Sequence, residues 1–149
     1  MNHKYFDIVI VGAGLVGLAT AHSIIKDFKD LRLAIIEKEK EICIHQSQRN
    51  SGVIHSGLYY KPGSERAINC TIGREMLTKY CKENKVEHDI CGKIVVATNQ
   101  NEIESLYKLE LNGKQNGLSG IKMINKKDIK KVEPYVDGIE ALFVPQSGI

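Results

Sequence analysis

The stretch Asp7-Ile-Val-Ile-Val-Gly-Ala-Gly-Leu-Val-Gly-Leu-Ala-Thr-Ala21 decides the fold of this chain. The β-branched run at residues 8–11 predicts a buried strand, and the Leu- and Ala-rich residues after the glycines predict a helix. Gly12 permits a tight turn between them, Gly14 allows the backbone to approach a pyrophosphate, and Gly17 lets the helix pack closely on the strand. The first turn of such a helix offers N–H groups and a positive dipole end to phosphates.

A second predicted strand, residues 31–36, ends directly before Glu37, twenty residues after Gly17. In the dinucleotide-binding pattern an acidic residue at this distance binds the ribose hydroxyls of an adenosine. The glycine pattern alone would also fit an ordinary strand–turn–helix unit. The acid at this spacing favours a dinucleotide site built on a β–α–β unit.

The composition is that of a globular protein. The 149 residues are 42% hydrophobic and 26% charged, which suits one domain with a core. The net charge of +3 comes from lysines spread among acids, so we expect no nucleic-acid binding. Residues 8–25 carry no charged side chain, but their glycines and polar residues make a poor membrane span, and no signal cleavage site follows. We therefore expect a cytoplasmic protein and leave peripheral membrane contact open.

The cysteines and histidines show no metal-site spacing. The four cysteines lack a CxxC or zinc-like grouping and are expected to be reduced, partly buried thiols: Cys43, Cys70, Cys81 and Cys91. His45 and His55 have no carboxylate at ligand spacing, so we predict no metal site. The isolated histidines are expected at the surface: His3, His22 and His88.

Residues 42–63 fit neither a single helix nor a single strand, and they are dense in glycine and hydrogen-bonding side chains. Loops of this length in compact domains are usually functional, although a polar surface connection is the alternative. In an NAD dehydrogenase domain, further alternating strands and helices would follow Glu37 at once. Here a polar loop follows Glu37 instead. This favours FAD as the dinucleotide, because FAD binds in an extended form with its isoalloxazine far from its adenosine.

Beyond this loop, Ser64 is a predicted N-cap of a helix that continues to about Asn84. Its apolar stripe, Ile68, Ile72 and Met76, is expected in the core. The other predicted elements are strands at residues 92–97, 121–124 and 141–144, a helix opened by a capping box at Asn99 and Glu102, and a brief helix that follows Asn125 and ends before Pro134.

The segment Gln46-Ser-Gln-Arg-Asn-Ser-Gly-Val-Ile-His-Ser-Gly-Leu-Tyr-Tyr-Lys-Pro-Gly63 closely resembles L-2-hydroxyglutarate oxidases and dehydrogenases. These are FAD enzymes of the D-amino-acid oxidase and glycerol-3-phosphate dehydrogenase type. The likeness continues through residues 91–97, 127–135 and 141–145, and so covers nearly the whole chain. The R-N-S-G-V-I-H-S-G-L-Y-Y string is far more specific than the glycine pattern.

The resemblance implies an α/β fold, with a Rossmann-like FAD-binding portion at residues 1–86 and the beginning of an α+β substrate domain at residues 87–149. It implies hydride transfer from C2 of an L-2-hydroxy acid to flavin N5, which yields a 2-oxo acid such as 2-oxoglutarate. Oxygen or a quinone would reoxidise the flavin. Because family members run to roughly 400 residues in two domains, we expect these 149 residues alone to bind FAD weakly or not at all, and not to turn over substrate.

The resemblance also assigns site residues. The implied cofactor-binding residues are Gly12, Gly14, Leu15, Val16, Gly17, Glu37, Lys38, Ser47, Arg49, Asn50, Ser51 and Gly52. Arg49 can neutralise phosphate charge or bind a carboxylate through its two-pronged guanidinium. His55 would lie close to the flavin, either as a general base for the substrate hydroxyl or as a packing residue. Tyr59, Tyr60 and Lys61 would line the substrate side, with core packing as the alternative for one of the tyrosines.

Two further hypotheses stay open at this point. The same fold could oxidise an amino acid or glycerol 3-phosphate, because those relatives share the glycine pattern. Alternatively, the chain could be a nucleotide-binding remnant without catalytic activity.

Overall fold

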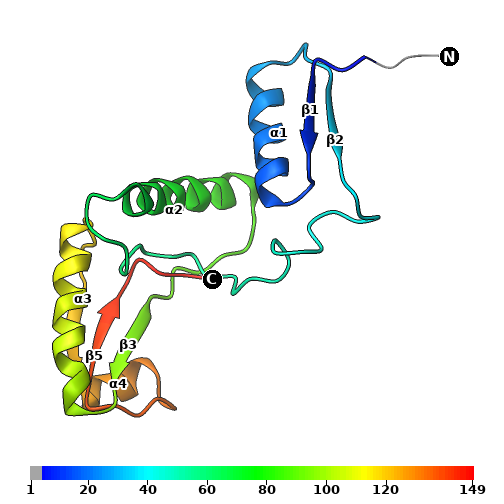
Figure 1. Cartoon of the computed structure of the whole chain (residues 1–149). Helices are drawn as coiled ribbons and strands as arrows, with labels where there is room; N and C mark the ends of the chain where they lie inside the picture. Colours follow the sequence, from blue (N-terminus) through cyan, green and yellow to red (C-terminus); the bar gives the residue numbers. More distant parts are fainter. Residues whose placement is uncertain (1–4) are drawn as a thin grey trace. The chain divides into compact units, whose positions relative to one another are not determined.

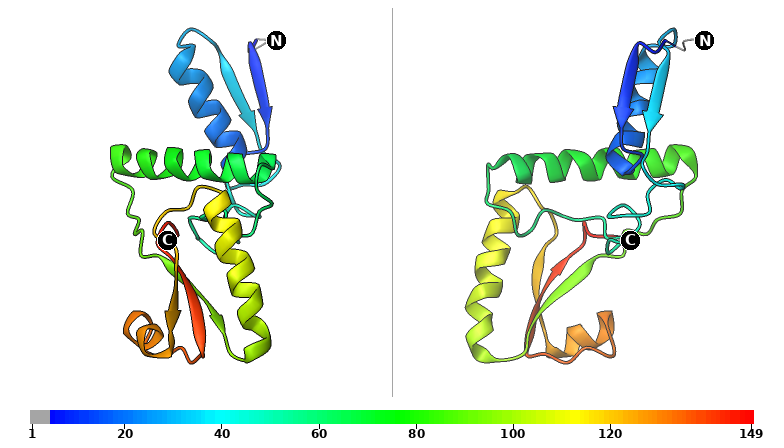
Figure 2. Two further views of the ribbon diagram at one scale, coloured as in Figure 1. Left: turned by 90° about the vertical axis from the view of Figure 1, so that its left-hand side faces the viewer. Right: turned by 45° about the vertical axis from the view of Figure 1, so that its right-hand side comes forward.

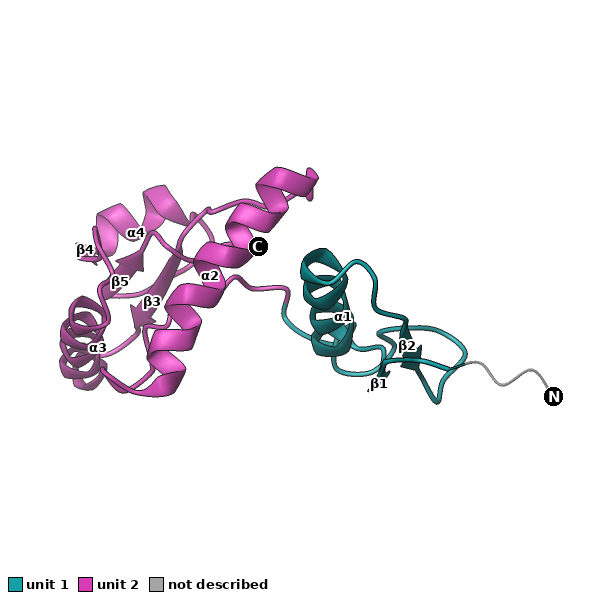
Figure 3. Cartoon of the chain, turned by 90° about the horizontal axis from the view of Figure 1, so that it is seen from above, with its two compact units in different colours: residues 1–51 teal, residues 52–149 magenta. Residues whose placement is uncertain are grey.

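The computed structural model describes residues 5–149, which form two compact units divided after Ser51 (Figure 3). His3, which was expected at the surface, lies outside the described residues. The predicted division into an FAD-binding portion and a substrate domain after residue 86 concerns function and stays a prediction. None of the helices within residues 5–149 is both long and apolar enough to cross a membrane.

The first unit is the predicted β–α–β unit. Strand β1 (Ile8–Val11) leads through a turn into helix α1 (Leu15–Asp27), and strand β2 (Leu33–Ile36) then returns alongside β1 (Figure 1). The strands are parallel, with residues 8–11 in register with residues 33–36. Parallel neighbours require a crossover, and α1 supplies it. The Rossmann-like start of the fold is therefore confirmed.

The prediction that β1 is buried is wrong for half of the strand. Val9 is 47% exposed and Val11 84% exposed, whereas Ile8 and Ile10 are partly covered. Alternate residues of a strand point to opposite faces, and α1 packs on only one face of the strand pair (Figure 2). A parallel strand is buried on both sides only where helices cover both faces of its sheet.

The second unit opens with the last part of the predicted loop, residues 52–63, followed by the predicted helix. The loop forms no helix or extended strand, only a single bridge between Ile54 and Gly148. Helix α2 (Glu65–Asn84) begins where Ser64 accepts a hydrogen bond through its side chain from the Ala67 N–H, at 3.3 Å. Both the N-cap and the helix end are confirmed.

The burial predicted for the apolar stripe of α2 is wrong. Ile68, Ile72 and Met76 are all exposed, and the small residues Ala67 and Cys81 are the buried ones. The helix therefore turns its smaller side chains toward the rest of its unit. Helical spacing identified an apolar face correctly but could not establish which face is covered.

The rest of the second unit is α+β. Strands β3 (Lys93–Ala97), β4 (Lys122–Asn125) and β5 (Glu140–Val144) form an antiparallel sheet in the order β3-β5-β4. The 3₁₀ turn η1 (Gln100–Glu102) leads into α3 (Ile103–Gln115), and α4 (Lys126–Val132) follows β4. Figure 2 shows α3 and α4 on opposite sides of the sheet. The larger core cluster lies on the α3 side: Leu58, Ala97, Leu106, Leu118, Ile121, Leu142 and Val144.

The two predicted caps differ in detail. The Asn125 side chain accepts the Asp128 N–H at 3.1 Å and caps α4, as predicted. The Glu102 carboxylate, by contrast, accepts the Thr98 N–H at 2.7 Å, so it reaches one residue farther back than in a capping box.

Candidate functional site

The turn between β1 and α1 depends on two glycines. Gly12 adopts a φ of +103°, a conformation that side chains with a Cβ rarely accept, and donates a hydrogen bond to the Ile36 carbonyl at 2.7 Å. A Cβ on Gly17 would lie 2.0 Å from the Gly12 carbonyl oxygen. The helix can therefore approach the end of the strand only because residue 17 has no side chain.

The loop after β2 folds back onto this turn. Ser47 Oγ accepts a hydrogen bond from the Leu15 N–H at 2.8 Å, at the first residue of α1. Gly14 precedes the helix without a side chain that could cap it, and a Cβ there would lie 3.2 Å from Ser47 Oγ. The Cys43 N–H donates to the Ala13 carbonyl at 3.1 Å. A residue far along the chain thus satisfies one of the unpaired donors of the helix start.

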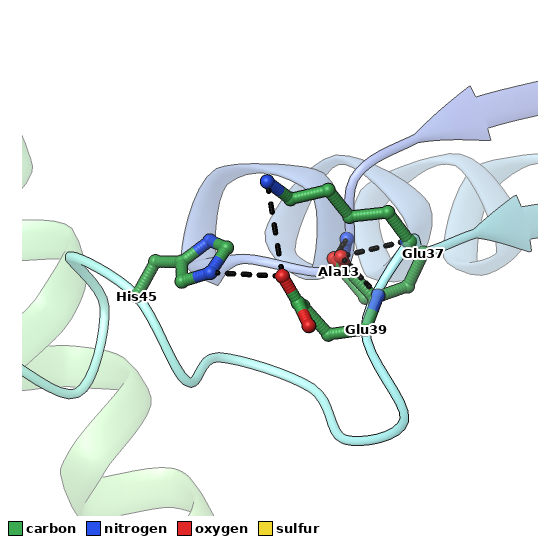
Figure 4. A network of polar contacts seen from close by, with 5 residues as sticks. Ala13, Glu37, Glu39 and His45 are labelled. Atoms are coloured by element: carbon green, nitrogen blue, oxygen red, sulfur yellow. Dashed lines mark hydrogen bonds and ion pairs between the residues drawn. The ribbon is translucent and has the colours of Figure 1, made fainter.

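Glu37 lies at the carboxyl end of β2 and faces the same turn (Figure 4). Its Oε2 accepts the Ala13 N–H at 2.7 Å, while Oε1 accepts the N–H groups of Lys38 at 2.8 Å and Glu39 at 3.1 Å. The pKa of Glu37 is lowered chiefly by the Ala13 hydrogen bond and then by that of Glu39, with a smaller contribution from the charge of His45. The Glu37 carboxylate is therefore held ionised beside the turn between β1 and α1.

His45 belongs to the same polar network. Its Nε2 lies 3.2 Å from Glu39 Oε1, and Lys38 Nζ lies 3.7 Å from the same oxygen (Figure 4). Within residues 5–149, no group of three or more His, Cys, Asp or Glu side chains is arranged to hold a metal ion.

Only a small cavity lies between the β1–α1 turn and the loop after β2. The cavity bounded by Gly14, Glu37, Glu39, His45 and Ser47, together with neighbouring loop residues, has a volume of about 50 Å³. Pockets that enclose small molecules usually measure roughly 300–1,000 Å³. A cavity of this size is too small to enclose a dinucleotide. Leu15 and Val16, which were predicted to contact the cofactor, are both exposed beside it.

The remaining predicted cofactor residues follow in the loop. The Asn50 side chain donates to the Ser47 carbonyl at 2.8 Å, and the Arg49 N–H donates to the carbonyls of His45 and Gln46, each at 3.2 Å. The side chains of Arg49 and Ser51 are exposed. The loop backbone is thus shaped by local hydrogen bonds, which leaves the Arg49 guanidinium at the surface. Gly52 is the first residue of the second unit.

In the second unit, the predicted catalytic and substrate residues line one cavity. His55, Tyr59 and Tyr60 border a cavity of about 300 Å³, together with Val53, Gly57, Leu58 and Lys93. The cavity volume falls in the range of small-molecule sites. Lys93 was not predicted, because a lysine at the start of a strand carries no sequence signal of its own.

Two asparagines that the sequence did not single out fix the loop that carries these residues. The Asn112 amide donates to the Leu58 carbonyl and to the Tyr60 carbonyl at 2.9 Å. The Asn116 amide donates to the Gly57 carbonyl at 3.1 Å and to the Tyr60 carbonyl at 2.8 Å. The available signal was a pair of asparagines four residues apart, Asn112 in the last turn of α3 and Asn116 at its C-cap, since residues at this spacing lie on one helix face.

The thiols are free, and three of them lie as expected: Cys81 is buried, and Cys43 and Cys70 are partly buried. Cys91 is exposed, which contradicts the expectation of partial burial. It stands two residues before the start of β3.

Known proteins resemble this chain over nearly its whole length. Residues 7–149 match the family described as FAD dependent oxidoreductase. The chain is 47% identical over 144 residues to the mitochondrial L-2-hydroxyglutarate dehydrogenase of Homo sapiens, a match that spans 97% of this chain and 31% of that protein. It is 45% identical over 144 residues to the L-2-hydroxyglutarate dehydrogenase of Indibacter alkaliphilus, covering 97% of this chain and 36% of that protein. The resemblance to these dehydrogenases is confirmed.

Solved structures agree on the fold. The FAD-bound L-alpha-glycerophosphate oxidase of Mycoplasma pneumoniae superposes with a TM-score of 0.86 at 29% identity, over 98% of this chain and 39% of that one. The glycine oxidase of Geobacillus kaustophilus gives a TM-score of 0.83 at 21% identity, over 96% of this chain and 40% of that one. The chain spans about a third of the length of the curated relatives it matches. Because the family described as FAD dependent oxidoreductase matches residues 7–149, the chain belongs to the FAD-dependent oxidoreductases.

Proposed function

We propose that this chain supplies the adenosine end of an FAD site and part of the substrate side for the oxidation of an L-2-hydroxy acid, L-2-hydroxyglutarate, to 2-oxoglutarate. The observation that carries the proposal is the 45–47% identity to L-2-hydroxyglutarate dehydrogenases. The R-N-S-G-V-I-H-S-G-L-Y-Y string supports the same substrate class. Because the chain covers only a third of those relatives, the complete activity is a proposal.

The turn between β1 and α1, together with Glu37, fits the adenosine diphosphate part of the cofactor. Glu37 is an ionised acceptor at the carboxyl end of β2, where ribose hydroxyls could donate to it. The N–H groups of Val16 and Gly17 belong to the first helical turn and have no intrahelical partner, so they suit a phosphate. Gly14 itself adds no side chain to this approach, and Ser47 Oγ lies beside it, where it accepts the Leu15 N–H. Leu15, Lys38 and Ser47 are the neighbouring cofactor residues of the proposal.

The segment from Arg49 to Gly52 would follow the cofactor from its phosphates toward the flavin. Arg49 carries an exposed guanidinium that can pair with a phosphate or with a substrate carboxylate. The bound flavin would supply the hydride acceptor, at N5. His55, in the 300 Å³ cavity, would accept the proton of the substrate hydroxyl, and a packing role beside the flavin is the alternative.

Several finer points belong to the same proposal. The electron acceptor would be oxygen or a quinone. A cytoplasmic location stays a prediction, since the human relative is named mitochondrial while the Indibacter relative is not. A peripheral membrane contact and the functional boundary after residue 86 stay predictions as well.

A competing substrate has one observation in its favour. The Mycoplasma L-alpha-glycerophosphate oxidase superposes well on this chain, so glycerol 3-phosphate is the second candidate. The sequence identity to that protein is 29%, lower than to the hydroxyglutarate dehydrogenases.

A chimera tests the proposal. These 149 residues would replace the matching third of the Indibacter dehydrogenase, and dye reduction would be measured with L-2-hydroxyglutarate, glycine and glycerol 3-phosphate. We expect FAD binding and a clear preference for L-2-hydroxyglutarate, as in the unaltered parent. A preference for either other substrate would assign this chain to a different branch of the family. Robust turnover by the 149 residues alone would refute the expectation that they are inactive.

A further inference from the structure

Lys93 occupies a position that usually holds an apolar residue. It is the first residue of β3 and pairs with Val144 of β5. Side chains alternate along a strand, so Lys93 shares a face with Val95 and Ala97, which pack into the core on the α3 side. Burying a cation beside these core-facing side chains costs free energy unless an opposite charge is buried with it.

No such counter-charge is present in the part of the chain that the structure describes. The Lys93 ammonium lies 4.5 Å from the centroid of the Tyr59 ring. None of the ion pairs within residues 5–149 involves Lys93. Its side chain is half-buried, and this burial lowers the pKa of the ammonium, with a smaller opposing effect from Cys70. The face of an aromatic ring attracts a cation, but it stabilises the charge less than a neighbouring anion would.

The ammonium borders the 300 Å³ cavity that His55, Tyr59 and Tyr60 also line. Tyr60 belongs to the segment that Asn112 and Asn116 hold in place, so this wall of the cavity is anchored to α3. The cavity therefore combines aromatic walls, an imidazole and one ammonium that lacks an anion. Such a lining is complementary to a small carboxylic acid.

We propose that Lys93 binds a carboxylate group of the substrate, with the Tyr59 ring positioning its ammonium. This inference rests on the proposed oxidation of a 2-hydroxy acid, but it concerns binding alone and requires no flavin. A carboxylate in the cavity supplies the missing counter-charge, and an ion pair formed away from water is stronger than one at the surface.

The test is a titration of the 149-residue chain with glutarate, followed by NMR. We expect saturable shifts at Lys93 and Tyr59, and none with glutaramide, which has the same shape without charge. Lys93→Gln should weaken glutarate binding by about tenfold or more, because a charged hydrogen bond is lost. Lys93→Arg, which keeps the charge, should retain most of the affinity. The matched control is Lys127→Gln, which changes an exposed lysine of α4 and should leave binding unchanged.

Some results would overturn the proposal. These are the absence of glutarate-dependent shifts at Lys93 in a chain whose spectrum shows it to be folded, or equal affinities in the wild-type and Lys93→Gln chains. In the chimera, Lys93→Gln should raise KM more than it lowers kcat. An unchanged KM for L-2-hydroxyglutarate would overturn the role of Lys93 and leave the proposed function standing. Conversely, a chimera that binds glutarate but fails to oxidise L-2-hydroxyglutarate would contradict the proposed function and leave the role of Lys93 standing.

Discussion

The Glu37 carboxylate accepts a hydrogen bond from the backbone N–H of Ala13, with 2.7 Å between the two atoms and 24 positions between the two residues. This contact joins the end of β2 to the glycine turn that follows β1. It places an ionised acceptor beside the start of α1, where the helix also presents its positive end. The contact thus brings together the two features that the proposed dinucleotide site requires, the acid after β2 and the start of α1.

The first prediction concerns Glu37→Gln. The amide keeps one oxygen acceptor and turns the other into a donor, so it cannot accept the Ala13 N–H and the N–H groups of Lys38 and Glu39 at the same time. It also loses the charge that strengthens a hydrogen bond from a ribose hydroxyl. In the chimera, we expect the affinity for FAD to fall about tenfold or more. Equilibrium flavin fluorescence would measure it. Asp30→Asn is the control, since Asp30 is an exposed acid at the opposite end of β2. Equal losses in both variants would contradict a specific role for Glu37.

The same carboxylate predicts a pH dependence of stability. Hydrogen bonds hold the pKa of Glu37 below its ordinary value of 4.5 in the folded chain. Its contribution to the free energy of unfolding is therefore complete above that value and is lost as the pH falls through the lower folded pKa. Urea denaturation across this acid range should show a smaller decline for Glu37→Gln than for the wild type. Parallel curves for the two proteins would contradict the assignment.

Gly17→Ala should destabilise the first unit. The added Cβ would lie 2.0 Å from the Gly12 carbonyl oxygen, so α1 must move away from β1. Overpacking of this kind typically costs about 1–3 kcal/mol. Amide hydrogen exchange in β1 would report the loss. Gly73→Ala, at a site in α2 with open space around it, should instead stabilise its helix by about 1 kcal/mol. Unchanged exchange in Gly17→Ala would show that the close approach is not needed.

Ser47→Ala should loosen the start of α1. The variant leaves the Leu15 N–H without its acceptor, and loss of a comparable helix cap costs about 1 kcal/mol. Exchange of the Leu15 amide should accelerate accordingly. Ser23→Ala, at an exposed site inside the same helix, should be neutral or slightly stabilising. If the two variants behaved alike, the cap from the distant loop would be irrelevant to stability.

Asn112→Ala should release the loop that carries Tyr59 and Tyr60. The carbonyls of Leu58 and Tyr60 would lose a donor, which costs about 1–3 kcal/mol where the groups are shielded from water. We expect a lower urea midpoint and greater mobility of both tyrosine rings by NMR. Asn69→Ala, on the exposed surface of α2, is the control and should change neither quantity.

The sequence predicted local structure well because the signals were local. The glycine pattern, the acid after β2 and the polar caps Ser64 and Asn125 each act within a few residues or at a fixed spacing. Their structural roles in the fold are therefore visible in the printed sequence. The assignment of the cofactor residues themselves stays a prediction.

What the sequence could not predict depends on contacts between distant segments. The exposure of Val11 and Met76 depends on which faces other elements cover, and periodicity does not determine that. The cap of α1 by Ser47 and the anchoring of Tyr60 by Asn116 join residues 32 and 56 positions apart. The position of the Lys93 ammonium over the Tyr59 ring, with no ion pair to a carboxylate of residues 5–149, also depends on distant segments. The sequence of β3 alone therefore did not indicate a role for Lys93.

The most direct test of the account is an NMR titration of the 149-residue chain with ADP, the part of FAD that the β1–α1 crossover should bind. Even weak binding would be visible at high ligand concentration. The account predicts shifts concentrated at the amides of residues 12–17 and at Glu37, with none in β4 or α4. Shifts that avoid the glycine turn, or that appear equally in Glu37→Gln, would contradict it.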